Sequence, residues 1–473
     1  VEGTTLGTIT SIDGDFVLPK VPQSAKNIKV SYIGMQSQVV RIRPNLKIVL
    51  KSDTELLDEV MVVAYGTAKK ESFTGSAAVI DNKKLEKRTV SNLSKALDGQ
   101  TTGVITTSGG GQPGGGSSVI IRGFGSINAS QEPLYVVDGI PFSGSINSIN
   151  PADIASMTVL KDASAGALYG ARGANGVVII NTKRGSDSKV NVNYKGTVGW
   201  ASRGVKAYDM VDQKEFVQLS YEALRNGYVF KNGYSWSDAG KQASADLSGK
   251  LGGEIYNPFK NYTWDTIINP ETGLVQSDAK SAWNENWLDE ILRSNALRHE
   301  HQFSVSGGSE RFKTMFSLGY LDENGILETT KFKRFSGRLN IDANVSEWFN
   351  SGLNASFANT QQNFSQYDAS SNSNVWYTAQ FLAPIYPAYA YDKETGEKIY
   401  EENGGSYDFG DGTYSARVGG FANQNPAANS KLDTHETLND NFSGRGSMYI
   451  NFLNDFKFTA NMGYDLMTQA RSD

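Results

Sequence analysis

The stretch FSGRLNIDANV, residues 335–345, decides the fold of this chain. Its apolar residues share one set of alternate positions: Phe335, Leu339, Ile341, Ala343 and Val345. The positions between them are polar: Ser336, Arg338, Asn340, Asp342 and Asn344. Because successive side chains of a β-strand point to opposite faces, this pattern predicts a strand with one apolar and one polar face. A tilted strand needs ~9–11 residues to cross a membrane, and this stretch is that long.

The same alternation recurs from Lys189 almost to the end of the chain, at 190–200, 303–305, 312–320, 353–357, 442–450 and 456–464. Together with 335–345 these stretches predict about seven strands. A connection of roughly 95 residues, a medium loop at 322–331 and a very long loop at 361–437 alternate with tight turns near 307–309, 346–347 and 454–455. Loops beyond ~15 residues are uncommon in soluble sandwiches, whereas membrane barrels combine short periplasmic turns with long outer loops. The sequence therefore predicts part of an antiparallel transmembrane β-barrel.

The composition excludes several classes of protein. The 45 basic and 50 acidic residues give a net charge of −5, which argues against a nucleic-acid binder. The chain has no cysteine, so disulfides, zinc–thiolate sites and thiol nucleophiles are excluded. No apolar run approaches the ~20 residues of a membrane-spanning helix.

No arrangement of residues in the sequence indicates catalysis. The Gly-rich run at 109–116 lacks the Gly-Lys-Ser/Thr ending of a phosphate-binding loop. His299 and His301 alternate along one strand, but no third metal ligand is evident, and surface strand positions explain them better. We therefore expect no enzyme activity, no cofactor and no metal site.

Changes of composition divide the chain into four segments. Residues 1–51 hold short alternating stretches around Asp13-Gly14, which predict an immunoglobulin-like β-sandwich that lacks its first strand. Residues 52–72 hold a short β-prone run flanked by charge, residues 73–185 form a Gly-rich α/β unit, and residues 186–473 contain the barrel strands. Val1 lies in a strand-like pattern, and seven is an odd number of strands, so we expect a chain cut short at both ends.

Local patterns predict the elements of the two smaller segments. Ser91 is expected to cap a short helix through Leu97. Strands are expected at 119–121, 134–137, 158–160 and 177–181 in the α/β unit, and around 8–9, 16–18, 28–32 and 46–50 near the N-terminus.

Three stretches resemble one protein family. LDEVMVVAYGT at 57–67 is similar to the linker that carries the TonB box in SusC/RagA-type importers of Bacteroidota. IRGFGS at 121–126 with PLYVVDGIP at 133–141, and LKDASA at 160–165 with LYGARGANG at 168–176, resemble the plug of the same family. Residues 3–35 look like the carboxypeptidase-regulatory-like domain that precedes the plug.

The resemblance implies a TonB-dependent importer in the bacterial outer membrane, with its N-terminal domain in the periplasm. It implies a 22-stranded barrel, of which about seven strands are present here, and a plug at 73–185. The implied partners are membrane lipid, TonB with ExbB and ExbD, and a SusD-like surface lipoprotein. The expected substrates are oligosaccharides too large for porins, with oligopeptides as the alternative.

The resemblance also implies candidate functional residues. The TonB-binding segment comprises Asp58, Glu59, Val60, Met61, Val62 and Val63. The candidates for plug structure and ionic contacts are Arg122, Gly123, Asp138, Gly139, Arg172 and Gly173, for which ordinary plug folding is an equally good explanation. The candidates for substrate contacts are Trp376, Tyr377, Tyr389 and Tyr391, which could equally pack the loops.

Two other functions stay open. A soluble, β-rich glycan-binding protein or adhesin would bury the apolar strand faces against each other rather than in lipid. A glycan-processing enzyme would need paired carboxylates in a cleft, whereas the Asp and Glu residues of this chain are scattered.

Overall fold

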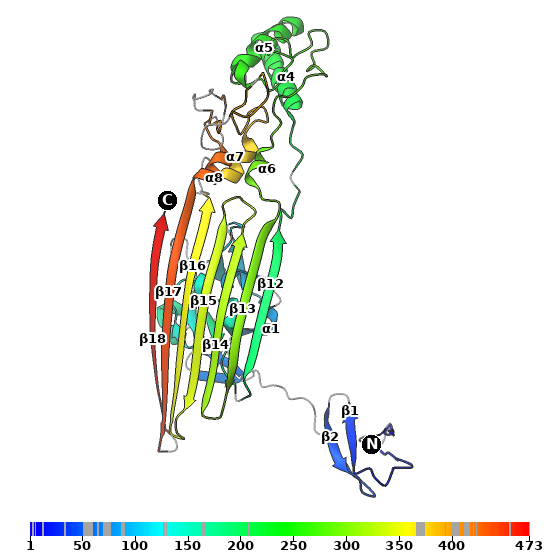
Figure 1. Cartoon of the computed structure of the whole chain (residues 1–473), viewed down its shortest axis with the longest axis vertical. Helices are drawn as coiled ribbons and strands as arrows, with labels where there is room; N and C mark the ends of the chain where they lie inside the picture. The colour runs from blue at the N-terminus through cyan, green and yellow to red at the C-terminus, as the bar shows by residue number, and fades with distance from the viewer. Residues whose placement is uncertain are drawn as a thin grey trace. The chain divides into compact units, whose positions relative to one another are not determined.

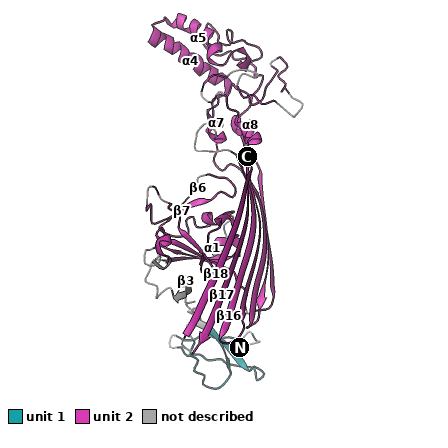
Figure 2. Cartoon of the chain, turned by 90° about the vertical axis from the view of Figure 1, so that its left-hand side faces the viewer, with its two compact units in different colours: residues 1–77 teal, residues 78–473 magenta. Residues whose placement is uncertain are grey.

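The computed structural model describes residues 1, 4, 6–11, 14–32, 35–50, 60–63, 66–69, 77–86, 90–108, 110–125, 128, 130–161, 167–186, 188–206, 208–365, 374–392, 394–399, 406–410, 417–419, 421, 423–453 and 456–472. The chain forms two compact units, Val1–Ala77 and Ala78–Asp473, which Figure 2 colours separately.

The first unit contains two antiparallel hairpins. In one, β1 (Asn27–Tyr32) pairs with β2 (Met35–Arg41), and in the other β3 (Val60–Val63) pairs with β4 (Gly66–Lys69). Gly14 has a φ of 87° and its N–H donates to Ser11 O at 3.0 Å, while Asp13, the other residue of the expected hairpin dipeptide, lies outside the described residues. The strands expected around 8–9, 16–18 and 46–50 do not form. Alternation is not sufficient for a strand, because its N–H and C=O groups also need a neighbouring strand to pair with.

The Gly-rich segment forms a mixed α/β domain on a five-stranded sheet, in the order β5-β10-β11-β8-β9. The strands are β5 (Ala77–Asp81), β8 (Leu134–Val137), β9 (Ile140–Pro141), β10 (Ile154–Leu160) and β11 (Val177–Thr182). A separate hairpin contains β6 (Val104–Ser108) and β7 (Ser117–Ile121). The helices and helical turns are short: α1 (Asn82–Glu86), α2 (Leu93–Ala96), η2 (Ile146–Ser148), η3 (Pro151–Asp153) and η4 (Ala167–Gly173).

All four strands expected in this α/β domain are present, and β10 is longer than predicted because it begins at Ile154. The helix near Ser91 begins one residue later than expected. Its cap is Asn92, whose side chain accepts a hydrogen bond from Ser94 N at 2.8 Å. Val159, Val178 and Ile180 are fully buried, so the central strands of the sheet form the core of the domain.

The C-terminal segment forms one sheet of seven long strands, each antiparallel to the next (Figure 1). The strands are β12 (Asn191–Ala201), β13 (Ala296–Gly308), β14 (Phe312–Asn324), β15 (Lys331–Asn344), β16 (Phe349–Ser365), β17 (Thr434–Phe452) and β18 (Phe456–Ser472). The three predicted tight turns and the two longest connections are confirmed, whereas the link between β14 and β15 is short and covers only residues 325–330. Several strands extend beyond the predicted ranges, and β16 runs on through a polar stretch at 359–365.

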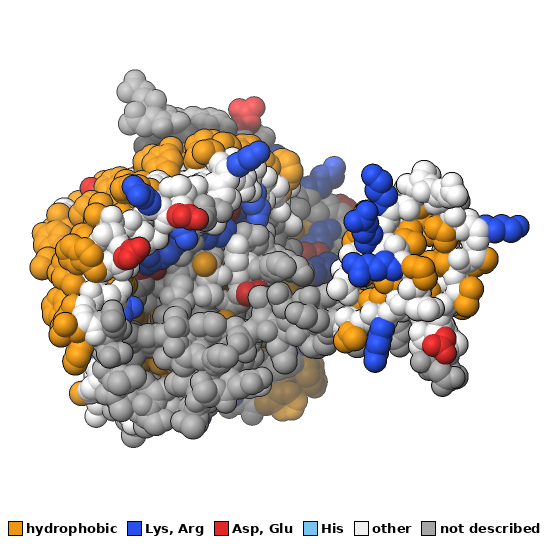
Figure 3. Space-filling model, turned by 90° about the horizontal axis from the view of Figure 1, so that it is seen from below, with side chains coloured by type: hydrophobic (Ala, Val, Ile, Leu, Met, Phe, Trp, Pro, Cys, Tyr) orange, Lys and Arg blue, Asp and Glu red, His pale blue; other side chains and the backbone are white. Residues whose placement is uncertain are grey.

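The two faces of this sheet differ sharply in polarity. Along β15 the side chains of Arg334, Ser336, Arg338 and Asn340 are buried against the α/β domain, whereas Phe335 is 46% exposed on the other face. The α/β domain lies on one side of the curved sheet (Figure 2), and hydrophobic side chains gather along the outer side (Figure 3). This is the arrangement of a membrane barrel wall that holds a plug on its inner, polar face.

The long connections form a helical lobe beyond one end of the sheet (Figure 1). Its elements are α4 (Gln213–Asn232), α5 (Trp236–Lys250), η5 (Glu254–Tyr256), α6 (Trp287–Ile291), α7 (Val375–Phe381) and α8 (Pro426–Leu432). Among the described residues, none of the helices has the length and apolarity to cross a bilayer. The helices of this lobe were not predicted, although the capping box formed by Asp212 and Glu215 is a sequence signal for the start of α4.

The outward face of β16 provides a test of which side of the sheet meets lipid. Leu353 is 48% exposed at the middle of the apolar stretch of this strand, so Leu353→Arg places a charge in the bilayer core. We expect it to lower the free energy of unfolding by about 2–4 kcal/mol, against about 0–1 kcal/mol for a charge near the interface. The matched control is Gln361→Arg, on the same face of β16 beside Glu436. Urea unfolding of the intact protein in lipid bilayers measures both values, and equal costs would contradict the assignment of the faces.

Candidate functional site

The candidate site is the seam between the α/β domain and the inner face of the sheet, and it begins at a two-residue turn. Asp138 and Gly139 connect β8 to β9, with φ values of 49° and 85°. Two positive φ values in a two-residue hairpin loop define a type I′ turn, for which Asp-Gly is a preferred sequence. The turn places the Asp138 carboxylate, which is 2% exposed, in the seam.

The Asp138 carboxylate joins both sides of the seam by hydrogen bonds. Within the α/β domain it accepts one from Thr182 N at 3.0 Å and another from Thr182 Oγ1 at 2.9 Å. From the sheet it accepts one from Asn354 Nδ2 on β16 at 3.3 Å. Hydrogen bonds to an ionised carboxylate are among the stronger ones in proteins, so this residue fixes the turn against the wall.

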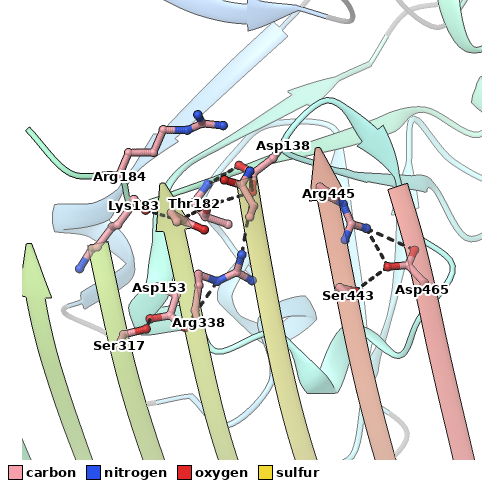
Figure 4. A network of polar contacts seen from close by, with 12 residues as sticks. Asp138, Asp153, Thr182, Lys183, Arg184, Ser317, Arg338, Ser443, Arg445 and Asp465 are labelled. Atoms are coloured by element: carbon pink, nitrogen blue, oxygen red, sulfur yellow. Dashed lines mark hydrogen bonds and ion pairs between the residues drawn. The ribbon is translucent and has the colours of Figure 1, made fainter. Parts of the chain in front are cut away.

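Arg338 of β15 lies between two buried carboxylates of the α/β domain (Figure 4). Its Nη1 is 3.9 Å from Asp138 Oδ2, and its Nε is 3.8 Å from Asp153 Oδ2. Asp153 also accepts a hydrogen bond at 2.7 Å from Ser317 Oγ of β14. Only 7% of the Arg338 side chain is exposed. Because the site is buried, water would not compensate the two carboxylates for the loss of this cation, and its removal would destabilise the α/β domain.

A second buried cluster surrounds Asn150, the cap of η3. Asn150 Nδ2 donates to Gln302 Oε1 at 3.0 Å and to Ser336 Oγ at 3.2 Å, both on the sheet. Arg334 is 1% exposed and donates to the carbonyl oxygen of Ser91 at 2.9 Å. A Cβ added at Gly319 would lie 2.4 Å from Asn150 Nδ2, so the glycine is what allows the close approach of the domain to β14.

A third contact lies at the last two strands of the sheet. Asp465 of β18 accepts hydrogen bonds from Arg445 Nη2 at 3.0 Å and from the backbone N of Ser143 at 3.3 Å. A cavity of about 20 Å³ lies between this contact and Arg338, and Asn441 lines it. Among the described residues, no group pairs with the side-chain oxygen or nitrogen of Asn441. A cavity of this size and polarity holds about one water molecule.

Among the candidate plug residues, the seam includes Asp138 and its turn partner Gly139. The side chains of Arg122 and Arg172 are exposed and lie outside the seam. Gly123 has a φ of 93° and adjoins Arg122, while Gly173 is buried at the end of η4. The structure therefore brings one of the three candidate ionic residues to the wall.

The candidate TonB-binding segment is described only in part. Asp58 and Glu59 lie outside the described residues. Val60, Met61, Val62 and Val63 form β3, which pairs with β4.

The four aromatic candidates all lie in the helical lobe, in two groups. Tyr389 donates a hydrogen bond to Glu290 at 3.1 Å, and Tyr391 donates one to Glu285. Burial, followed by the neighbouring carboxylates, raises the pKa of both hydroxyl groups, so both remain protonated donors. These two tyrosines are therefore engaged in holding the lobe together.

The other aromatic pair is more accessible. Trp376 is partly buried against the core of the lobe, and the guanidinium of Arg203 lies 5.0 Å from the centre of its ring. Tyr377 is 38% exposed, and its ring centre is 4.4 Å from that of Phe381, which is 57% exposed. An exposed aromatic pair of this kind can stack on a ligand.

Sequence reasoning did not assign a role to the residues of the wall that hold the α/β domain, notably Arg338, Asn354 and Arg334. The available signal was the polar face of 335–345, where a cation and amides take the places that face the barrel interior. A charged residue that is buried on the inner face of a strand needs a polar or charged partner. The polar face of 335–345 could therefore have been used to predict contacts between this strand and the α/β domain.

A seven-stranded antiparallel sheet with an apolar outer face, holding a mixed α/β domain on its polar face, defines a plugged transmembrane β-barrel. Residues 69–177 match the TonB-dependent Receptor Plug Domain, and residues 1–62 match the CarboxypepD_reg-like domain. The TonB-dependent receptor SusC of Bacteroides thetaiotaomicron is 32% identical over 98% of this chain and 42% of its own length. The TonB-dependent receptor P26 of Formosa agariphila is 30% identical over 96% of the chain and 39% of its own length. The chain belongs to the SusC-like TonB-dependent receptors, and it spans about two fifths of the length of these two relatives.

Solved structures show the same likeness. The RagAB peptide importer in its open-open state has a TM-score of 0.63 at 27% identity, over 87% of this chain and 43% of the matched chain. In the closed-closed state the TM-score is 0.61 at 26% identity, over 85% and 42%. The recognised family and the predicted fold class are thereby confirmed, and the α/β domain is called the plug below.

Arg338 provides a test of how the plug is held. In Arg338→Met both Asp138 and Asp153 lose their cation while remaining buried, which we expect to cost about 3–5 kcal/mol of plug stability. The matched control is Arg184→Met, which removes an ion pair between the plug and β15 whose side chains are 42% and 28% exposed. That loss should cost about 0–1 kcal/mol. Protease susceptibility of the plug during urea titration of the intact receptor measures both, and equal losses would rule out a special role for Arg338.

Proposed function

We propose that the chain is the periplasmic domain, plug and part of the barrel of an outer-membrane importer that is energised through TonB, ExbB and ExbD. The observation that carries the proposal is the plug itself, held on the polar face of a wall whose other face is apolar. A large barrel has a lumen wide enough to be an open channel, so import has to be coupled to movement of a domain that closes it. No nucleotide site is required, because the inner membrane supplies the energy.

The proposed coupling begins in the linker before the plug. Residues 58–63 would add as a strand to the sheet of TonB, the mode of binding in which main-chain hydrogen bonds supply affinity. A pull on this segment reaches β5 first, because β5 follows the linker and lies at the edge of the plug sheet. An edge strand is bonded on one side only, so it is the strand that separates most readily from the sheet.

The proposed substrates are oligosaccharides, taken up with a SusD-like surface lipoprotein as partner. The helical lobe lies at the end of the barrel strands that carries the long connections, which in membrane barrels is the outer side. The planes of the exposed rings of Tyr377 and Phe381 are inclined by 43°, and each ring separately offers a flat apolar face on which a sugar ring can stack. The N-terminal domain would then lie in the periplasm.

Oligopeptides are the second candidate substrate class, and one observation favours them. The RagAB importer, which resembles this chain over 87% of its length, is a peptide importer. The two classes differ in chemistry, since peptides present charged termini and a chain of amides, whereas neutral sugars present hydroxyl groups and apolar ring faces.

Removal of the TonB-binding segment tests the mode of energy coupling. We expect deletion of residues 58–63 to abolish uptake in cells, while substrate binding to the purified receptor stays within about twofold, because the proposed substrate contacts lie on other residues. The matched control is deletion of residues 52–57, which shortens the same linker equally and should leave uptake in place. Unchanged uptake without residues 58–63 would refute the assignment.

Direct binding measurements test the substrate class. Titration calorimetry of the intact receptor and its lipoprotein with neutral oligosaccharides and with mixed oligopeptides should give saturable binding for the sugars alone. Tyr377→Ala should weaken that binding by about tenfold, since stacking on an aromatic ring is worth about 1–2 kcal/mol. Saturable binding of peptides instead would replace oligosaccharides by peptides as the cargo.

A further inference from the structure

The linker strand β3 already has a partner within the chain. β3 pairs antiparallel with β4, with Val60 opposite Lys69, Met61 opposite Ala68, Val62 opposite Thr67 and Val63 opposite Gly66. Two residues, 64 and 65, separate the strands in the sequence. In such a hairpin the pair next to the turn exchanges both backbone hydrogen bonds, and bonded and non-bonded pairs then alternate.

This register fixes the direction of every backbone group of β3. Met61 and Val63 direct their N–H and C=O groups to β4, in the pairs with Ala68 and Gly66. Val60 and Val62 belong to the non-bonded pairs, so their N–H and C=O groups point away from β4. Among the described residues, β3 and β4 form a sheet of only these two strands. Within that part of the chain the outer edge of β3 is unpaired, and a third strand can join it.

We propose that β4 is part of the TonB-binding site: the β3–β4 hairpin is the unit that is recognised, and the partner strand adds to the outer edge of β3 through Val60 and Val62. This inference rests on the proposed function, in which β3 is the segment that binds TonB. It adds the residues Gly66–Lys69 to the binding site and specifies which edge of β3 the partner uses.

The number of hydrogen bonds favours a partner strand that adds to β3 over one that replaces β4. A partner strand that took the place of β4 would first have to break the two bonded pairs of the hairpin, whereas addition to the outer edge keeps them. A hairpin of two short strands is marginally stable, and a third strand is what makes such a sheet persistent. β4 holds β3 extended before binding, which lowers the ordering cost that a free linker would bear on binding.

Proline substitutions in β4 test this proposal. Ala68→Pro removes an N–H that donates to β3, whereas the matched control Thr67→Pro removes an N–H that points away from β3. We expect Ala68→Pro to weaken binding of the intact receptor to the TonB C-terminal domain by roughly tenfold, because β3 must then be ordered on binding. Thr67→Pro should bind within about twofold of the unsubstituted receptor. Equal or tighter binding by Ala68→Pro would overturn the proposal.

A reversible covalent lock provides an independent measurement. Val60 and Lys69 are opposite each other in a non-bonded pair, whose Cα atoms lie about 4.5 Å apart, within the range that a disulfide spans. The chain has no cysteine of its own, so the double variant Val60→Cys/Lys69→Cys forms a single defined bridge. The oxidised lock should bind TonB at least as tightly as the reduced form. Loss of binding on oxidation that reduction restores would show that the partner replaces β4.

A third variant separates this proposal from the proposed function. Val62→Pro removes an N–H at the outer edge of β3 and leaves the bonds to β4 in place. It should reduce TonB binding by at least about tenfold. If Val62→Pro and the deletion of residues 58–63 both bind normally, the TonB assignment itself is wrong. If they lose binding while Ala68→Pro does not, the TonB assignment stands and the role of β4 is wrong.

Discussion

Backbone hydrogen bonding inside a bilayer is the constraint on which the structure of this chain depends. Hydrocarbon offers no partner to an N–H or C=O group, so strands that cross it have to bond to one another along their whole length. When both edges of a strand are paired, only its two faces can differ in polarity. The two faces of β15 differ in this way. Phe335 and its apolar neighbours face outward, while Arg334, Arg338 and Asn340 face the plug. Both the membrane position and the plug site follow from this one alternation.

The plug is held mainly by polar groups, and this has an energetic consequence. Arg338 lies 3.8–3.9 Å from two buried carboxylates, which is contact between charges without a short hydrogen bond. Buried ion pairs of this kind contribute little net stability compared with apolar packing, but they are costly to break singly. Removal of one member of this cluster is therefore expected to destabilise the plug more than replacement of the whole cluster by apolar residues. The cavity beside Asn441 is also lined by polar groups, and its volume of about 20 Å³ is large enough for one water molecule.

The strand of the plug that follows the linker in the sequence is an edge strand of the plug sheet. The linker leads into β5, at the edge of the plug sheet, and β5 adjoins β10, which ends opposite the start of β11. The seam residues lie at the far ends of these strands and in the turns next to them: Thr182 ends β11, and Asp153 precedes β10. The strands β10 and β11 therefore connect the edge strand β5 to the residues that contact the wall.

The sequence by itself determined the seven barrel strands, their two faces and the strands of the plug. These features are local, because a period of two is set by neighbouring residues, and a slip of one residue would expose the wrong face. In the N-terminal unit it determined the strand at 28–32, which is β1, but not the strands expected at 8–9, 16–18 and 46–50, which have no partner strand among the described residues. The helices of the lobe were missed as well, although the cap at Asp212 marked the first of them.

Only the tertiary structure decided which residues hold the plug. Arg338, Asp138 and Asp153 come from distant parts of the sequence, and the contact among them exists because β15 passes the hairpin turn at that height. In the structure Arg122 and Arg172 are exposed, although they lie in plug motifs just as Asp138 does. The physical reason is that the alternation of neighbouring residues determines a strand and its two faces, whereas the packing of whole domains determines which residue lies beside a buried charge.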